Sequence, residues 1–236
     1  MTTSTFVSNG QSISGELFSP SSGSSLPTVV VAYGTEGLNM PFGKLIRDFC
    51  STLAANGFLA FIPDYFSSTR TKPGFESVFD PNGAHARFDQ WITVLNDSID
   101  HTQSLTGAAT GRTAFVGFSL GGHLVLRSGA GPSVKAVIDF FGPIATSAGS
   151  NITLSIAGNL PAVQIHHGKE DKIVHYSDSE TLEGWLKSKS VPYELWGYDS
   201  NGHPGQENIF PPGPGWSYQS QALATTRSIQ FLSAHV

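Results

Sequence analysis

The sequence predicts an α/β fold with a mostly parallel central sheet, helices on both of its faces and an N-terminal antiparallel hairpin. From residue 28 onward, short apolar runs rich in β-branched residues alternate with longer segments in which apolar residues recur at helical spacing. The N-terminal segment differs, because two strand-like runs flank Asn9-Gly10. This dipeptide favours a tight hairpin, since both of its residues tolerate positive φ.

The predicted hairpin pairs residues 4–7 with residues 11–18. Six later apolar runs, most of them bounded by glycine or proline, are predicted to be strands of the sheet, the first of them buried on both of its faces. They comprise residues 28–33, 58–62, 113–116, 134–138, 162–165 and 192–196. In such a sheet, ligands bind beyond the carboxyl ends of the strands, so the residues that follow each strand are where chemistry is expected.

The segments between these strands are predicted to be amphipathic helices, because their apolar residues recur every three or four positions. They comprise residues 42–56, a helix marked by Phe88 to Ile99, and residues 120–130, 177–188 and 217–234. Residues 67–83 are rich in Ser, Thr, Pro and Gly and are predicted to be a loop.

The composition indicates one domain spanning residues 1–236 and excludes several classes of protein. Hydrophobic residues make up 39%, which is enough for a core, and the net charge of −5 argues against binding to nucleic acid or to an anionic membrane. The single cysteine, Cys50, excludes an intrachain disulfide and a multi-cysteine zinc site. The N-terminus shows no basic segment followed by an apolar run, so a cytoplasmic location is expected.

The segment Gly117-Phe118-Ser119-Leu120-Gly121 predicts a nucleophilic serine. It lies between a predicted strand and a predicted helix, where a sharp turn holds the serine in a strained backbone and exposes its Oγ. The N-terminus of the following helix also stabilises negative charge. The alternative is a glycine-rich turn in which the serine is incidental.

A serine hydroxyl needs a histidine base and an acid that orients the base, and in this setting they follow the serine in the order acid, histidine. Asp171 lies just past the strand 162–165, and Asp139, at the end of the strand before it, is the rival acid. His203 lies on the glycine-rich loop after the last strand and is the predicted base. The remaining candidates are expected to be structural or solvated: His123, His166, His167 and His235.

A tetrahedral intermediate also needs hydrogen-bond donors directed at its oxyanion. One is predicted to be the backbone N–H of Leu120, directly after the nucleophile. The other is expected from the loop 34–39, after the first parallel strand, with Gly37 as the candidate.

Taken together, these segments resemble the dienelactone hydrolase family, a group of α/β-hydrolases with a compact domain and no large lid. The matching segments are residues 29–39, 57–65, 117–122, 167–171 and 202–203. The resemblance implies that Ser119 is the nucleophile, Asp171 the acid and His203 the base, with the oxyanion amides at Leu120 and Gly37. It also matches Glu36 to a glutamate that contacts the resting nucleophile in the family, and it implies neither a metal nor an organic cofactor.

The sequence departs from the family at two points. The type members carry cysteine where this chain has Ser119, so a serine here needs full general-base help. They also hold a substrate carboxylate with arginines, for which Arg70 and Arg87 are the candidates, although both are more typical of solvated surface arginines. A neutral ester or lactone is therefore expected rather than an anionic dienelactone. Tyr65, Phe66 and Phe141 are predicted to line the pocket, with Phe75 and Phe79 as further candidates.

The leading hypothesis is a serine hydrolase of carboxylic esters or lactones that forms an acyl-enzyme. An acyltransferase or thioesterase with the same triad, and a non-catalytic binding protein of this fold, are the alternatives. The expected partner is a small-molecule substrate, and the expected state is a monomer or a small homo-oligomer.

Overall fold

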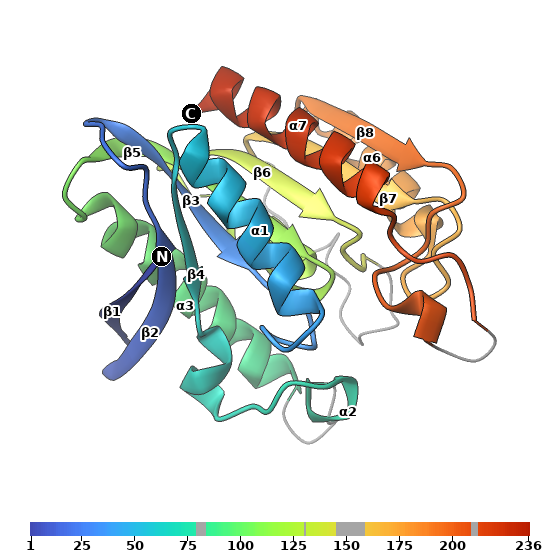
Figure 1. Cartoon of the computed structure of the whole chain (residues 1–236), viewed down its shortest axis with the longest axis horizontal. Coiled ribbons are helices and arrows are strands. Elements are labelled where there is room, and N and C mark those ends of the chain that lie inside the picture. Colours follow the sequence, from blue (N-terminus) through green and yellow to red (C-terminus); the bar gives the residue numbers. More distant parts are fainter. Residues whose placement is uncertain (79–83, 130, 145–158, 209–211) are drawn as a thin grey trace.

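The computed structural model describes residues 1–78, 84–129, 131–144, 159–208 and 212–236. Within these residues, eight strands form one sheet in the order β1-β2-β4-β3-β5-β6-β7-β8 (Figure 1). β1 and β2 pair antiparallel, β2 also pairs antiparallel with β4, and every later pair is parallel. The strands are β1 (Thr2–Ser8), β2 (Gln11–Phe18), β3 (Leu26–Ala32), β4 (Leu59–Pro63), β5 (Ala108–Phe118), β6 (Val134–Phe140), β7 (Ala162–Gly168) and β8 (Tyr193–Tyr198).

Helices cover both faces of the sheet, as predicted. α1 (Phe42–Ala55) and α7 (Tyr218–His235) lie in front of it in Figure 1, and α3 (Ala84–Gln103) lies behind it. α4 (Leu120–Ser128) packs against α3, and α6 (Tyr176–Ser188) packs against β7 and β8. None of the helices in the described residues combines the length and the apolar character needed to cross a bilayer.

The predicted N-terminal hairpin is confirmed. Asn9 and Gly10 have φ of 48° and 73°, and Ser8 faces Gln11 across the turn. Positive φ at both central residues is the geometry that matches the twist of the flanking strands.

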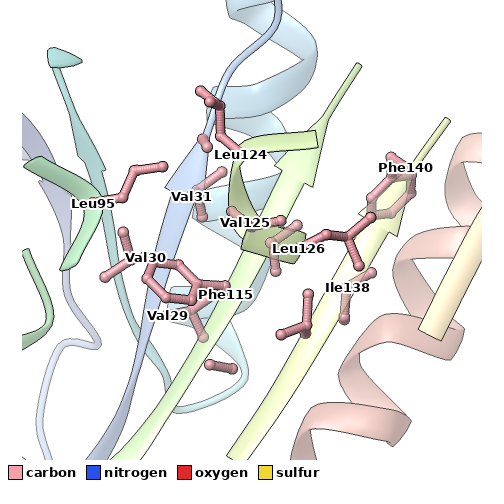
Figure 2. Packing of buried hydrophobic residues seen from close by; sticks show 14 of the residues in the cluster. Val29, Val30, Val31, Leu95, Phe115, Leu124, Val125, Leu126, Ile138 and Phe140 are labelled. Carbon is pink, nitrogen blue, oxygen red and sulfur yellow. The ribbon is translucent and has the colours of Figure 1, made fainter. Parts of the chain in front are cut away.

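The core lies where β3, β5 and β6 meet α4 and α3 (Figure 2). The strands run through the middle of the sheet, so their side chains are buried on both faces, which explains the nearly continuous apolar runs in the sequence. The labelled side chains in Figure 2 are Val29, Val30, Val31, Leu95, Phe115, Leu124, Val125, Leu126, Ile138 and Phe140. β5, β6 and β7 are parallel neighbours, so their carboxyl ends lie at one edge of the sheet.

Two segments differ from their predicted structure. β5 begins at Ala108 instead of residue 113, because its first part pairs through the backbone with the start of β3 and carries no apolar pattern. The predicted loop 67–83 overlaps two short helices, η1 (Tyr65–Thr69) and α2 (Phe75–Val78), and residues 79–83 lie outside the described part of the chain.

Candidate active site

Ser119 occupies the sharp turn between β5 and α4. Its φ of 53° and ψ of −118° are rarely adopted by a residue with a side chain, a strain that costs on the order of 1–3 kcal/mol. The Ser119 N–H donates to the carbonyl of Phe140 at 2.9 Å. Side chains at Gly117 and Gly121 would collide with the carbonyl oxygens of Gly121 and Ala32, respectively. The glycines therefore allow the close approach of strand and helix that the turn requires.

Asp171 and His203 meet although they lie 32 residues apart in the chain. The His203 Nδ1–H donates to Asp171 Oδ2 at 2.7 Å, and both side chains are buried. Asp171 Oδ1 accepts from the backbone N–H groups of Ile173 (2.8 Å) and Val174 (2.9 Å). The carboxylate is therefore held by donors on both oxygens, and the imidazole carries its proton on Nδ1.

The pKa of the Asp171 carboxyl lies below its usual range. Burial acts to raise this pKa, but the hydrogen bonds from His167 and His203 outweigh it. His167 Nε2 lies 3.4 Å from Asp171 Oδ2 and also donates to the Val174 carbonyl at 2.9 Å, while its Nδ1 accepts from Ser179 at 2.6 Å. Asp171 is thus maintained as an ionised acceptor beside His203.

Gln206, which no sequence pattern singled out, connects the loops that carry Asp171 and His203. Its Oε1 accepts from the backbone N–H of His203 at 3.0 Å and from that of Lys172 at 3.1 Å. Its Nε2 donates to the carbonyl of Glu170 at 3.1 Å, and the side chain is completely buried. A glutamine in a glycine- and proline-rich loop has no sequence signature for this role, which depends on the fold bringing the two loops together.

Two further histidines that were expected to be structural are buried and hydrogen-bonded. His123 bonds through Nδ1 to the Pro143 carbonyl at 3.0 Å, and His166 bonds to the hydroxyl of Tyr198 at 2.8 Å. Burial lowers the pKa of each to about 3, so both imidazoles are neutral at physiological pH. Neither ring contributes a positive charge near the sheet edge.

The loop after β3 approaches Ser119 through Gly34. A Cβ at this position would lie 3.3 Å from the Cβ and 3.8 Å from the Oγ of Ser119. The Gly37 N–H donates to the Gly34 carbonyl at 3.0 Å and so takes part in a turn. Glu36, Gly37 and Leu120 all line the cavity that contains Ser119, and their proposed roles remain predictions.

The cavity beside Ser119 has a volume of about 410 Å³ and is lined mainly by apolar side chains. His203 and Phe141 both line it, and the edge of one ring meets the other with their centroids 4.8 Å apart. Phe141 has a φ of 45°, which is unusual for a bulky residue. Its backbone therefore leaves β6 in a strained conformation with the aromatic ring at the wall of the cavity. Phe75 and Trp216 also line it.

Tyr65 and Phe66 do not line this cavity, contrary to their predicted placement. After β4 the chain enters η1, which begins at Tyr65. The Tyr65 hydroxyl donates to the carbonyl of Tyr33, the residue directly after β3, at 2.6 Å, and the two tyrosine rings stack. The ring of Phe66 packs edge-on against Tyr33. Both residues belong to the core.

Asp139, the alternative candidate for the acid, lies in a different environment from Asp171. It is completely buried, its Oδ1 accepts from the Gly142 N–H at 3.0 Å, and its Oδ2 has no hydrogen-bond partner among the described residues. Side chains at Gly122 and Gly142 would collide with this carboxylate. Burial raises the pKa of Asp139 to about 7, against the lowering effects of His167 and the Gly142 N–H.

The raised pKa predicts a pH-dependent stability. Between about pH 4 and pH 7 the native state binds a proton at Asp139 that the unfolded chain releases, so the free energy of unfolding falls as pH rises. The expected fall is on the order of 4 kcal/mol from this group. Urea denaturation at a series of pH values should show Asp139→Asn gaining stability relative to the native chain across this window. If the free energy of unfolding changed with pH in the same way for Asp139→Asn and the native chain, the raised pKa of Asp139 would be wrong. The control is Asp100→Asn, at an exposed position, which should follow the native curve.

Comparison with known proteins identifies the family of this chain and agrees with its fold. The model of the dienelactone hydrolase family matches residues 13–235. The chain is 27% identical over 227 residues to a protein of Synechocystis sp. named "Putative carboxymethylenebutenolidase", covering 90% of this chain and 87% of that protein. Similar solved structures include a "Putative Dienelactone Hydrolase" from Klebsiella pneumoniae, with a TM-score of 0.79, 20% identity and 98% of each chain covered. Another is Est1E from Butyrivibrio proteoclasticus, with a TM-score of 0.70, 14% identity and the same coverage.

The structural neighbours have the α/β-hydrolase fold, in agreement with the strand order of the sheet. The family match spans nearly the whole chain, from β2 to the end of α7. This chain therefore belongs to the dienelactone hydrolase family.

Proposed function

We propose that the chain is a serine hydrolase of carboxylic esters or lactones that works through an acyl-enzyme. The observation that carries this proposal is the 2.7 Å bond between His203 Nδ1 and Asp171 Oδ2, together with the cavity that His203 and Ser119 both line. With the proton fixed on Nδ1, Nε2 of His203 is left as the basic nitrogen. The strained turn exposes Ser119 as the nucleophile.

In this mechanism the Ser119 oxygen attacks the substrate carbonyl while His203 Nε2 takes the hydroxyl proton. The negative charge that develops on the carbonyl oxygen is stabilised by the Leu120 N–H, at the N-terminus of α4, and by a donor from the loop 34–37. The C–O bond to the alcohol then breaks, and the alcohol leaves with the proton held by His203. Asp171 remains ionised throughout and stabilises the imidazolium that forms.

Water completes the reaction by the same steps. His203 removes a proton from the water, whose oxygen attacks the acyl carbonyl, and the proton passes to Ser119 as the acid departs. An alcohol in the place of water gives the acyltransferase alternative, and a thioester in the place of the ester, with a thiol as the leaving group, gives the thioesterase alternative.

A fluorophosphonate probe tests the nucleophile without any assumption about the substrate. We expect one probe molecule to attach to folded protein, with the adduct on the peptide that contains Ser119, and labelling to slow strongly in His203→Ala. Intact mass and peptide mapping provide the measurement, and urea-denatured protein is the control. A folded chain that is not labelled at Ser119 would support the binding-protein alternative instead.

A further inference from the structure

Much of the wall of the cavity beside Ser119 is apolar. α1 contributes Phe42, Leu45, Ile46 and Phe49, which are spaced so that they lie on one face of the helix. α7, which contacts α1 on the same side of the sheet (Figure 1), contributes Gln221 and Thr225. One face of α1 therefore forms an apolar wall next to the nucleophile.

The ends of β5 and β6 add an aromatic cluster to this wall. The rings of Phe118 and Phe140 stack with their centroids 4.6 Å apart, and Phe49 meets them edge-on at 5.6 and 5.7 Å. All three line the cavity. Rings that hold one another in this way provide a preformed apolar surface, against which a substrate gains by leaving water.

The charged groups near the cavity do not favour a substrate that carries an ionised carboxyl in addition to its ester. Glu36 lines the cavity and carries the same charge that such a substrate would bring. All thirteen Lys and Arg residues lie in the described part of the chain, and none of them lines the cavity.

The arginines considered in the sequence analysis lie elsewhere. Arg70 is exposed on the loop after η1, and Arg87 donates to the carbonyl of Val78 at 3.1 Å. Arg47 lies on α1 but turns away to pair with Glu16 at 2.6 Å. A substrate carboxylate would therefore lose its hydration at this apolar wall without gaining a cationic partner, which is strongly unfavourable.

We propose that the substrate is a neutral ester or lactone whose apolar part lies against the cluster of Phe49, Phe118 and Phe140, and that substrates with a second, ionised carboxyl are rejected. This inference rests on the proposed hydrolase function and specifies its substrate class. It sets the chain apart from the activity that the name carboxymethylenebutenolidase denotes for its relative, because that name describes a lactone bearing a carboxyl group.

Matched esters test this selectivity. p-Nitrophenyl hexanoate and mono-p-nitrophenyl adipate share their leaving group and differ at the far end of the acyl chain, which is a methyl group in one and a carboxylate in the other. We expect kcat/KM to be on the order of 100-fold higher for the hexanoate. Along the series from acetate to hexanoate, kcat/KM should rise roughly 4-fold per methylene. Methyl 4-acetoxybenzoate and 4-acetoxybenzoate make the same comparison on the alcohol side.

Two substitutions locate the origin of the selectivity. Thr225→Arg places a cation on the cavity wall and should raise the adipate-to-hexanoate ratio of kcat/KM by about 10-fold. Thr226→Arg adds the same charge one residue further along α7, at an exposed position outside the cavity, and should leave the ratio unchanged. Glu36→Gln should raise the ratio by a few-fold, because the like charge is removed.

Selectivity for neutral esters and hydrolysis at Ser119 give different results in these experiments. Equal or faster turnover of the anionic esters would overturn the inference and leave the hydrolase function intact. Absence of turnover with all of the esters, together with no labelling of Ser119 by the fluorophosphonate, would overturn both.

Discussion

Replacing Ser119 with alanine is expected to lower kcat for p-nitrophenyl hexanoate by about 10⁶-fold, as is typical when the nucleophile of a triad is removed. The alanine lacks the oxygen that would bond to the acyl group, so no acyl-enzyme forms. The amides proposed as oxyanion donors, at Leu120 and in the loop 34–37, are unchanged in this variant and should leave about 10³- to 10⁴-fold acceleration over water. Steady-state release of p-nitrophenol, corrected for spontaneous hydrolysis, measures the loss.

The control is Ser233→Ala, at an exposed position on α7. It should retain full activity, and both variants should unfold at urea concentrations close to that of the native chain. Activity within 10-fold of native in a pure sample of Ser119→Ala would mean that another group performs the attack.

Asp171→Asn is expected to lower kcat by about 10⁴-fold while leaving the fold intact. Oδ1 of Asp171 accepts from the N–H groups of Ile173 and Val174, so the amide oxygen of an asparagine should stay at that position. The NH₂ group then faces Nδ1 of His203. It can only donate, which forces the histidine proton onto Nε2 and removes the base.

Nitrogen NMR of the His203 ring provides a readout that a purely structural role would not change, because the two tautomers have different nitrogen shifts. Asp139→Asn is the matched control, since it replaces a buried acid at the end of the neighbouring strand whose hydrogen bond is to the Gly142 N–H and not to His203. We expect this variant to keep kcat within a few-fold of native. Loss of activity in Asp139→Asn with retention in Asp171→Asn would assign the acid role to Asp139.

Much of the fold follows from the sequence because its signals are local. Asn9-Gly10 permits only a few turn geometries, and the β-branched run at 28–33 has the composition of a fully buried strand. The nucleophile turn is equally local, since Gly117, Ser119 and Gly121 combine small residues with a strand before them and a helix after them. The first part of β5 lacked such a signal, because its pairing with β3 involves backbone groups that every residue has.

The sequence shows which residues of the candidate site follow a predicted strand, but it does not show which of them meet in the folded chain. Asp171 lies just after β7 and Asp139 lies at the end of β6, and the contact with His203 selects Asp171 as the acid candidate. Tyr65 follows a strand as well, but the path of the chain after β4 turns it toward Tyr33 and into the core. The hydrogen bond that engages the Gly37 N–H in a turn likewise depends on the exact backbone path of its loop.

The bonds made by Gln206 have a consequence for how the site comes apart. Gln206 lies on the loop of His203 and bonds across to the loop of Asp171 through the Lys172 N–H and the Glu170 carbonyl, so separation of the two loops breaks both of these bonds. The proton-transfer pair is therefore either assembled or lost as a unit. Molecules in which one of the two loops has opened while the other stays ordered are disfavoured by Gln206, a side chain whose hydrogen bonds are to backbone groups and not to Ser119 or the imidazole of His203.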